Sequence, residues 1–132
     1  MDRLSLDANV LFSAAYRANA GLLRFWKLRN VILCSSRYAL EEARINLTED
    51  DQRRRLTRLA RSLQWFSAAP LELPVGVSVP EKDEPILRAA MEAQATHLIT
   101  GDIRHFGPYF GKAIGGILIM SPSEYPRKRH QR

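Results

Sequence analysis

Four acidic residues are spaced so that one group of carboxylates could form where secondary-structure elements begin and end: Asp7, Glu42, Asp83 and Asp102. Asp7 directly follows the strand-like segment 4–6, and Asp102 lies two residues after the apolar run 97–100. In an open parallel sheet, ligands bind beyond the carboxyl ends of the strands. Both aspartates are therefore expected at the same rim of a sheet, where a metal ion is one partner that carboxylates can share. The alternative for either residue alone is a helix cap or a turn, where aspartate is common.

The two glutamates in the helical segment 37–47 are predicted to face different surroundings. Glu41 has Arg37 four residues before it and Arg44 three residues after it, which is typical of a charged, solvated stripe. Glu42 shares its side of the helix with residues 38, 39, 45 and 46, which are partly apolar. Because a carboxylate in such surroundings needs a partner, Glu42 is the candidate for the site and Glu41 is assigned to the surface.

The same comparison separates Asp83 from Glu84. Glu84 begins a stripe of alternating charge at every fourth residue, as on a solvent-exposed helix face. Asp83 lies at the start of that helix, on the side of Ile86, Leu87 and Ala90. An N-cap would explain Asp83 without any metal. We include it in the site because three other acids are expected at the same rim.

The elements that must position these acids follow from the hydrophobic pattern. Short runs of Val, Ile and Leu alternate with stretches of helical period, which indicates a parallel sheet covered on both faces. The expected strands are 4–6, 31–34, 97–100 and 117–120, with room for one short strand in the proline-rich loop 67–82. The expected helices are 8–15, 22–26, 37–47, 49–66 with Thr48 as its N-cap, and 83–94. The pattern therefore predicts an α/β sandwich.

Length and composition fit a single domain, 1–126, followed by a basic tail, 127–132. The 132 residues include 20 basic and 14 acidic ones, and the net charge of +6 favours a polyanionic partner such as nucleic acid. Cys34 is the single cysteine, so we expect a buried thiol, no internal disulfide and a cytoplasmic protein. The apolar runs are far shorter than the ~20 residues that span a bilayer, so neither a membrane segment nor a signal peptide is expected.

These residues resemble the PIN-domain ribonuclease family, which includes the VapC toxins of bacterial toxin–antitoxin pairs. The segment 6–11 resembles the family's opening motif of a hydrophobic residue, Asp, any residue, Asn and a hydrophobic residue. Glu42, six residues after Ser36, resembles the family's glutamate, and Asp83 resembles the acid that opens a helix. The segment 100–106, with Thr-Gly-Asp followed by Phe, resembles the fourth acidic motif and is closer to a less studied branch than to the best-known VapC toxins.

The resemblance implies a three-layer α/β sandwich with a central, mostly parallel sheet of about five strands, a Mg²⁺ or Mn²⁺ site, and hydrolysis of RNA phosphodiester bonds. The acids that carry over as catalytic and metal-binding residues are Asp7, Glu42, Asp83 and Asp102. Asn9 and Thr100 carry over as supporting residues that orient water or an acid. Some members have a further acid two residues after the fourth. Arg104 stands at that position here, so the resemblance does not imply a second metal ion.

An RNA substrate requires cations near its phosphates. The candidates are Arg104 and His105, next to the fourth acid, and Arg54 and Arg58 in the long helical segment. The alternative for the two helix arginines is a solvated face. If the chain is a toxin, an antitoxin should cover the acidic rim with an arginine or a basic segment. The apolar cluster within 22–26 could support a homodimer or pack in the core.

Two other functions are left open by the residues. The same fold could serve as a catalytically silent module that binds RNA or protein, although all four acids are present. The second is another acid-rich α/β protein, such as a phosphatase or a phospho-receiver domain. A receiver would need a lysine after a late strand, and none follows Thr100. A nucleotide-binding loop is disfavoured because the glycine-rich motifs are absent.

Overall fold

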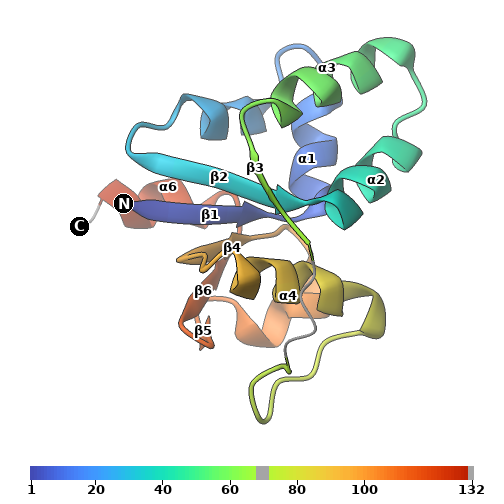
Figure 1. Cartoon of the computed structure of the whole chain (residues 1–132). Coiled ribbons are helices and arrows are strands. Elements are labelled where there is room, and N and C mark those ends of the chain that lie inside the picture. Colours follow the sequence, from blue (N-terminus) through green and yellow to red (C-terminus); the bar gives the residue numbers. More distant parts are fainter. Residues whose placement is uncertain (68–71, 131–132) are drawn as a thin grey trace.

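The computed structural model describes residues 1–67 and 72–130 (Figure 1). Within these ranges six strands form one sheet in the order β3-β2-β1-β4-β6-β5, and all pairings are parallel except that of β5 with β6. The strands are β1 (Asp2–Leu6), β2 (Val31–Ser36), β3 (Gln64–Phe66), β4 (His97–Ile99), β5 (Ala113–Ile114) and β6 (Ile117–Met120). The α-helices are α1 (Ala8–Ala15), α2 (Arg37–Asn46), α3 (Asp50–Ala60), α4 (Glu84–Glu92), α5 (Ile103–Phe106) and α6 (Glu124–His130), and the 3₁₀ helices are η1 (Gly21–Lys27), η2 (Glu81–Asp83) and η3 (Gly107–Tyr109). The predicted mostly parallel α/β fold is confirmed.

The order of the strands places a crevice beside β1. From β1 the chain moves to β2 and β3, and it then returns through α4 to β4 on the other side of β1. Figure 1 shows α1 and α3 on one side of the sheet and α4 on the other. The direction of the connections therefore reverses between β1 and β4, where Leu6 pairs with Ile99. At such a switch point the loops diverge and leave a crevice beyond the carboxyl ends of the strands.

The core contains several residues whose role the sequence left open. Phe25 of η1 is fully buried, so the apolar cluster within 22–26 packs at least partly in the core. Tyr125 of α6 is fully buried as well, with ring contacts to Phe25 and His97. Residues 127–130, expected as a tail, lie in α6, and 131–132 lie outside the described residues. Cys34 is buried as predicted, and burial raises the pKa of its thiol to about 11.

The helix predicted over 49–66 is wrong beyond residue 60. The structure ends α3 at Ala60 and uses 64–66 as the edge strand β3, which pairs with the end of β2. After Ala60 the chain forms tighter turns, because the Ser62 N–H donates to the Leu59 carbonyl at 3.2 Å and the Leu63 N–H to the Ala60 carbonyl at 3.1 Å. The indole N–H of Trp26 also donates to the Leu59 carbonyl, at 3.0 Å. Trp65 and Phe66 are aromatic residues that suit a strand. A tertiary contact and an open sheet edge thus override a helical spacing of leucines.

Smaller differences concern element types and limits. The N-cap of α3 is Glu49, which forms a capping box with Gln52, and not Thr48. The segment around 22–26 is a 3₁₀ helix, and β5 completes a hairpin with β6 that the sequence did not indicate. The additional strand expected in 67–82 is absent from 67 and 72–82, and 68–71 lie outside the described residues. Across the described chain, none of the helices has the length and apolar character needed to cross a membrane.

Candidate functional site

Asp7 links the end of β1 to the start of α1 and is only 4% exposed. Its backbone N–H donates to the Ile99 carbonyl at 3.0 Å, which continues the pairing of β1 with β4. Its Oδ1 accepts from the backbone N–H of Ala8 at 2.6 Å, as an N-cap does. Its Oδ2 accepts from the Thr100 hydroxyl at 2.8 Å and from the Asn9 amide at 3.2 Å. Asp7 is therefore fixed from both strands and from α1.

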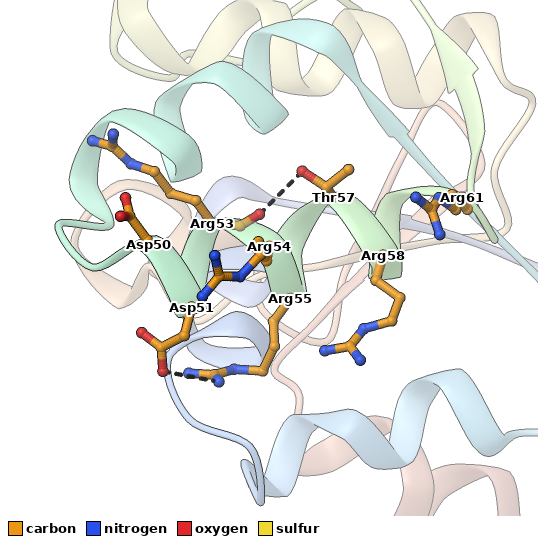
Figure 2. Close-up of a pocket in the computed structure, with 8 residues that line it drawn as sticks. All are labelled: Asp50, Asp51, Arg53, Arg54, Arg55, Thr57, Arg58 and Arg61. Atoms are coloured by element: carbon orange, nitrogen blue, oxygen red, sulfur yellow. Dashed lines mark hydrogen bonds and ion pairs between the residues drawn. The ribbon is translucent and has the colours of Figure 1, made fainter.

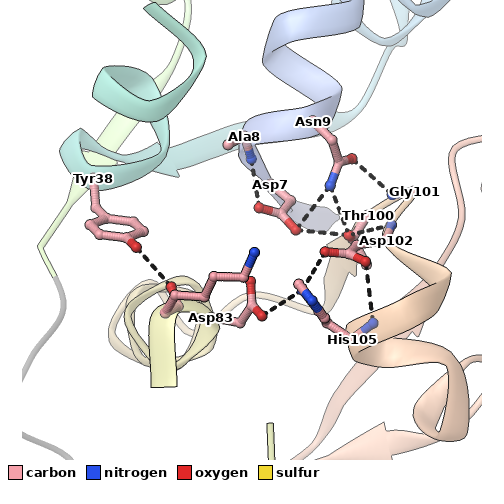
Figure 3. Close-up of polar contacts among 10 residues, drawn as sticks. Asp7, Ala8, Asn9, Tyr38, Asp83, Thr100, Gly101, Asp102 and His105 are labelled. Carbon is pink, nitrogen blue, oxygen red and sulfur yellow. Dashed lines mark hydrogen bonds and ion pairs between the residues drawn. The ribbon is translucent and has the colours of Figure 1, made fainter. Parts of the chain in front are cut away.

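The Thr100 hydroxyl connects the two strand ends (Figure 3). Besides donating to Asp7, it accepts from the Asn9 amide at 3.2 Å and from the Asp102 backbone N–H at 3.0 Å. The Asn9 side-chain oxygen accepts from the Gly101 N–H at 2.8 Å. A Cβ added at Gly101 would lie 3.4 Å from that oxygen, so the turn passes close to Asn9. Asn9 and Thr100 thus hold Asp7 and Asp102 in fixed positions.

Asp83 and Asp102 meet at the imidazole of His105 (Figure 3). His105 Nδ1 lies 2.7 Å from Asp83 Oδ2 and 2.7 Å from Asp102 Oδ2. Asp102 is also the N-cap of α5, because its Oδ1 accepts from the His105 backbone N–H at 3.2 Å. Asp83 occupies the N-cap position of α4 but makes no side-chain capping bond. Capping therefore does not account for Asp83, which is 8% exposed.

The four predicted acids line one pocket of about 400 Å³, called the acidic pocket below, together with Asn9, Asn46 and Lys82. Glu42 reaches it from the exposed side of α2. Glu41, on the same helix, lies outside the pocket, and its carboxylate accepts from Arg44 at 3.0 Å. Both glutamates are exposed, and of the two only Glu42 lines the acidic pocket.

The buried carboxyl groups of the acidic pocket hold protons more tightly than usual. The pKa of Asp7 is raised from 3.8 to about 6. Burial is the largest cause, the bonds from Thr100 and Ala8 oppose the rise, and the charges of Asp83 and Glu42 add to it. Burial also raises the pKa of Asp83, and Asp102 adds to the rise while His105 and Lys82 counteract it. Carboxylates that repel each other in a buried site are stabilised by a cation between them.

The donor atoms of the acidic pocket fit a divalent cation. One carboxylate oxygen each of Asp83 and Asp102 and a ring nitrogen of His105 lie within 4.8 Å of one another. Asp83 Oδ2 and His105 Nδ1 are buried and make no hydrogen bond, although they lie 2.7 Å apart. The two atoms form an ion pair that is not aligned as a hydrogen bond. Because buried polar atoms are nearly always fully hydrogen-bonded, this arrangement leaves them available to a cation. The oxygens suit Mg²⁺ or Mn²⁺.

The structure does not bring Arg54 and Arg58 into the acidic pocket. They are exposed on α3 and line a separate, open groove of about 610 Å³ (Figure 2). Two further arginines of α3 have structural contacts: Arg55 donates to backbone carbonyls at the end of α1, and Arg53 donates to the carbonyl of Leu47, directly after α2. Of the arginines predicted to bind RNA, only Arg104, which is exposed, lies next to one of the four acids.

Sequence reasoning did not assign Lys82 or Tyr38 to this region, and it did not predict the contacts that His105 makes. Lys82 lines the acidic pocket, and its carbonyl accepts from the Tyr38 hydroxyl at 2.9 Å, which ties α2 to η2. The position of Lys82 directly before Asp83 was the signal in the sequence that it could lie at this pocket. His105 was assigned to phosphate contact, but its ring lies against two acids. A residue three positions after an N-cap lies on the same helical turn, which is where the structure has it.

Comparison with known proteins gives matches of two kinds. A family model described as PIN domain matches residues 3–104. Among solved structures, the chain is similar to VapBC2 from Rickettsia felis bound to a DNA fragment from their promoter, with a TM-score of 0.63 and 14% identity over 90% of this chain and 98% of that one. It is also similar to FitAB bound to the IR36 DNA fragment, with a TM-score of 0.52 and 17% identity over 90% and 94% of the two chains. No curated protein sequence matches.

Proposed function

The chain belongs to the PIN-domain family, as its acidic motifs predicted, and we propose that it is a metal-dependent ribonuclease that hydrolyses RNA phosphodiester bonds. The observation that carries the proposal is the convergence of four carboxylates from separate elements on one pocket. A fold supports many functions, so the support comes from this site. The raised pKa values of Asp7 and Asp83 add to it, because they reflect an arrangement that a cation would stabilise.

Mg²⁺ or Mn²⁺ is the proposed cofactor. We assign Asp7 and Asp102 as its most direct ligands, and Glu42 and Asp83 as residues that hold it through water or position the nucleophile. When bound, such an ion polarises the phosphate and makes a hydroxide nucleophile accessible near neutral pH. Thr100 and Asn9 keep Asp7 Oδ2 in place by hydrogen bonds, so the carboxylate needs little reorganisation when the substrate arrives.

The RNA backbone is proposed to cross the mouth of the acidic pocket. Lys82 lines the pocket and is exposed, and Arg104 is exposed two residues after Asp102, so both can meet phosphate oxygens there. Arg54 and Arg58 would bind a more distant part of a longer RNA, since their groove on α3 is separate. Phosphate contacts of this kind give an affinity that falls steeply with salt.

We also propose that the chain is a cytoplasmic toxin with a protein antitoxin. Two solved structures similar to it are VapBC2 and FitAB, each bound to DNA. An antitoxin would inhibit this chain most directly by placing an arginine or a basic segment among the four carboxylates of the acidic pocket. We propose in addition that two copies of this chain form a homodimer.

The experiment compares cleavage of single-stranded and structured RNAs by the wild type, Asp7→Asn, Glu42→Gln and Glu41→Gln, with Mg²⁺, Mn²⁺ or a chelator. The wild type should cleave only with metal, and Asp7→Asn and Glu42→Gln should lose cleavage. Glu41→Gln is the matched control, because it makes the same chemical change one residue away, outside the acidic pocket, and it should retain activity.

Three results would contradict the proposal. Equal cleavage by the wild type and Asp7→Asn would mean that a contaminant or another site cuts the RNA. RNA binding without cleavage, together with no metal-induced rise in melting temperature at millimolar Mn²⁺, would favour the catalytically silent binding module. Equal loss in Glu41→Gln and Glu42→Gln would show that a general change of α2, and not the pocket carboxylate, is responsible.

A further inference from the structure

His105 is not among the residues that line the acidic pocket, but it places a nitrogen atom against two of the pocket's carboxylates, those of Asp83 and Asp102. Its side chain is 16% exposed, and its Nδ1 lies 2.7 Å from one oxygen each of Asp83 and Asp102. The ring is held there by α5, since the His105 backbone N–H donates to Asp102 Oδ1 at 3.2 Å. The imidazole is therefore part of the carboxylate cluster and does not face the solvent.

The contacts of Nδ1 have the length of ion pairs and are also close to the spacing of neighbouring ligands of one ion. Nδ1 and Asp83 Oδ2 are both buried and, despite their separation of 2.7 Å, neither makes a hydrogen bond. Two ligands on adjacent vertices of an octahedral ion, each at about 2.1 Å, lie about 3 Å apart. The Asp83, Asp102 and His105 donor atoms lie within 4.8 Å of one another. One ion could therefore contact Asp102 and His105 directly and Asp83 through a water molecule.

We propose that His105 is a ligand of the divalent cation in the acidic pocket and that its nitrogen shifts the preference of the site from Mg²⁺ toward first-row transition ions such as Mn²⁺. The inference rests on the metal site of the proposed function. Mg²⁺ prefers hard oxygen ligands and gives up its waters reluctantly, whereas imidazole nitrogen suits the transition metals. Three aspartates and a glutamate alone would not discriminate in this way.

A different role for the same ring has the opposite consequence for metal affinity. If the imidazole only neutralises Asp83 and Asp102 as a cation in the metal-free protein, an incoming metal must displace it. Removal of the ring would then free the two carboxylates and strengthen the binding of Mg²⁺ and Mn²⁺ alike. The ligand role predicts weaker binding of Mn²⁺ and little change for Mg²⁺.

The test measures Mn²⁺ and Mg²⁺ binding by calorimetry for the wild type, His105→Ala and Arg104→Gln, and records pulsed EPR spectra of the Mn²⁺-loaded proteins. His105→Ala should weaken Mn²⁺ binding by about tenfold or more, and Mg²⁺ binding by much less. The wild type should show a ¹⁴N coupling to Mn²⁺ that His105→Ala lacks. Arg104→Gln removes a positive charge from the same turn, so it should affect both ions similarly and keep the ¹⁴N coupling.

The wild-type spectrum alone decides the question if His105→Ala fails to fold. A wild type without ¹⁴N coupling, equal or tighter Mn²⁺ binding by His105→Ala, or no binding of either ion at millimolar concentration would each overturn the proposal. RNA cleavage is scored separately. A protein that shows the coupling but never cuts RNA would refute the proposed ribonuclease and leave the ligand role of His105 standing. A protein that cuts RNA with metal but lacks the coupling would refute the ligand role of His105 and leave the proposed ribonuclease standing.

Discussion

Replacing Asp7 with asparagine should make the metal-free protein less sensitive to rising pH. Asp7 is 4% exposed, and burial with neighbouring charge raises its pKa from 3.8 to about 6 in the folded protein. Below pH 3.8 the carboxyl is protonated in both the folded and the unfolded chain, so its full contribution to stability is present. As the pH rises through 6, the folded protein must bury a charge that the unfolded chain keeps in water, and that stability is lost.

The size of this loss follows from the two pKa values. A pKa that moves from 3.8 to about 6 corresponds to about 3 kcal/mol in the free energy of unfolding, at about 1.4 kcal/mol per pH unit. Asparagine cannot accept the bonds from Ala8 and Thr100 as well as a carboxylate does, which costs about 1 kcal/mol at every pH. The variant should therefore be less stable than the wild type at pH 4 and more stable at pH 7.

Urea denaturation in a chelating buffer, at steps from pH 4 to pH 8, measures both curves. Tryptophan fluorescence is a suitable signal, because Trp26 and Trp65 are partly buried in the folded protein. Glu92→Gln on the exposed face of α4 is the control, and its curve should run parallel to that of the wild type. Parallel curves for Asp7→Asn and the wild type would refute the reasoning, because they would show that Asp7 is not a buried, charged group near neutral pH.

Three further outcomes are expected. Thr100→Val should lower the free energy of unfolding by about 2–4 kcal/mol in urea titrations at pH 7, because it removes a charge-assisted bond and leaves the Asp102 N–H without its acceptor; an unchanged midpoint would contradict the network. Mn²⁺ at one hundred times its Kd should stabilise the wild type by about 2.7 kcal/mol, or about 10 °C in Tm, in a thermal melt, and Asp102→Asn should show much less. Replacing Arg54 and Arg58 with alanine should reduce the slope of log affinity against log salt for single-stranded RNA by about 1.4 if both contact phosphate; an unchanged slope would assign them to the solvated surface of α3.

The parts of this fold that follow from the sequence are those in which local pattern and tertiary position agree. The predicted helix 8–15 coincides with α1 because Asp7 caps it and its apolar face packs on the sheet. The predicted strand 117–120 coincides with β6, whose residues are nearly all buried. In both cases the spacing of apolar residues and the burial that it requires point to the same element.

Long-range contacts explain where the sequence was insufficient. The leucines of 56–63 fit a helix. In the structure, however, Trp26 donates to the Leu59 carbonyl, and Trp65 and Phe66 pair with the free edge of β2. Nothing near residue 60 signals either contact. The contact of Tyr38 with the Lys82 carbonyl is similar, since it joins α2 to η2 across 44 residues and brings Lys82 to the pocket.

From the sequence, each acid was predicted to be either a helix cap or a member of a site. In the structure the two roles are compatible for a carboxylate. An ionised carboxyl group has two oxygens and about four lone pairs, so one oxygen can cap while the other faces elsewhere. Asp7 and Asp102 each use Oδ1 to accept a backbone N–H. The Oδ2 of Asp7 accepts from the Thr100 hydroxyl, and the Oδ2 of Asp102 lies 2.7 Å from His105 Nδ1. Asp83 makes no capping bond at all. The capping bonds therefore orient two of the acids for the pocket, because a side chain held by its own helix has little freedom left to turn away from the others.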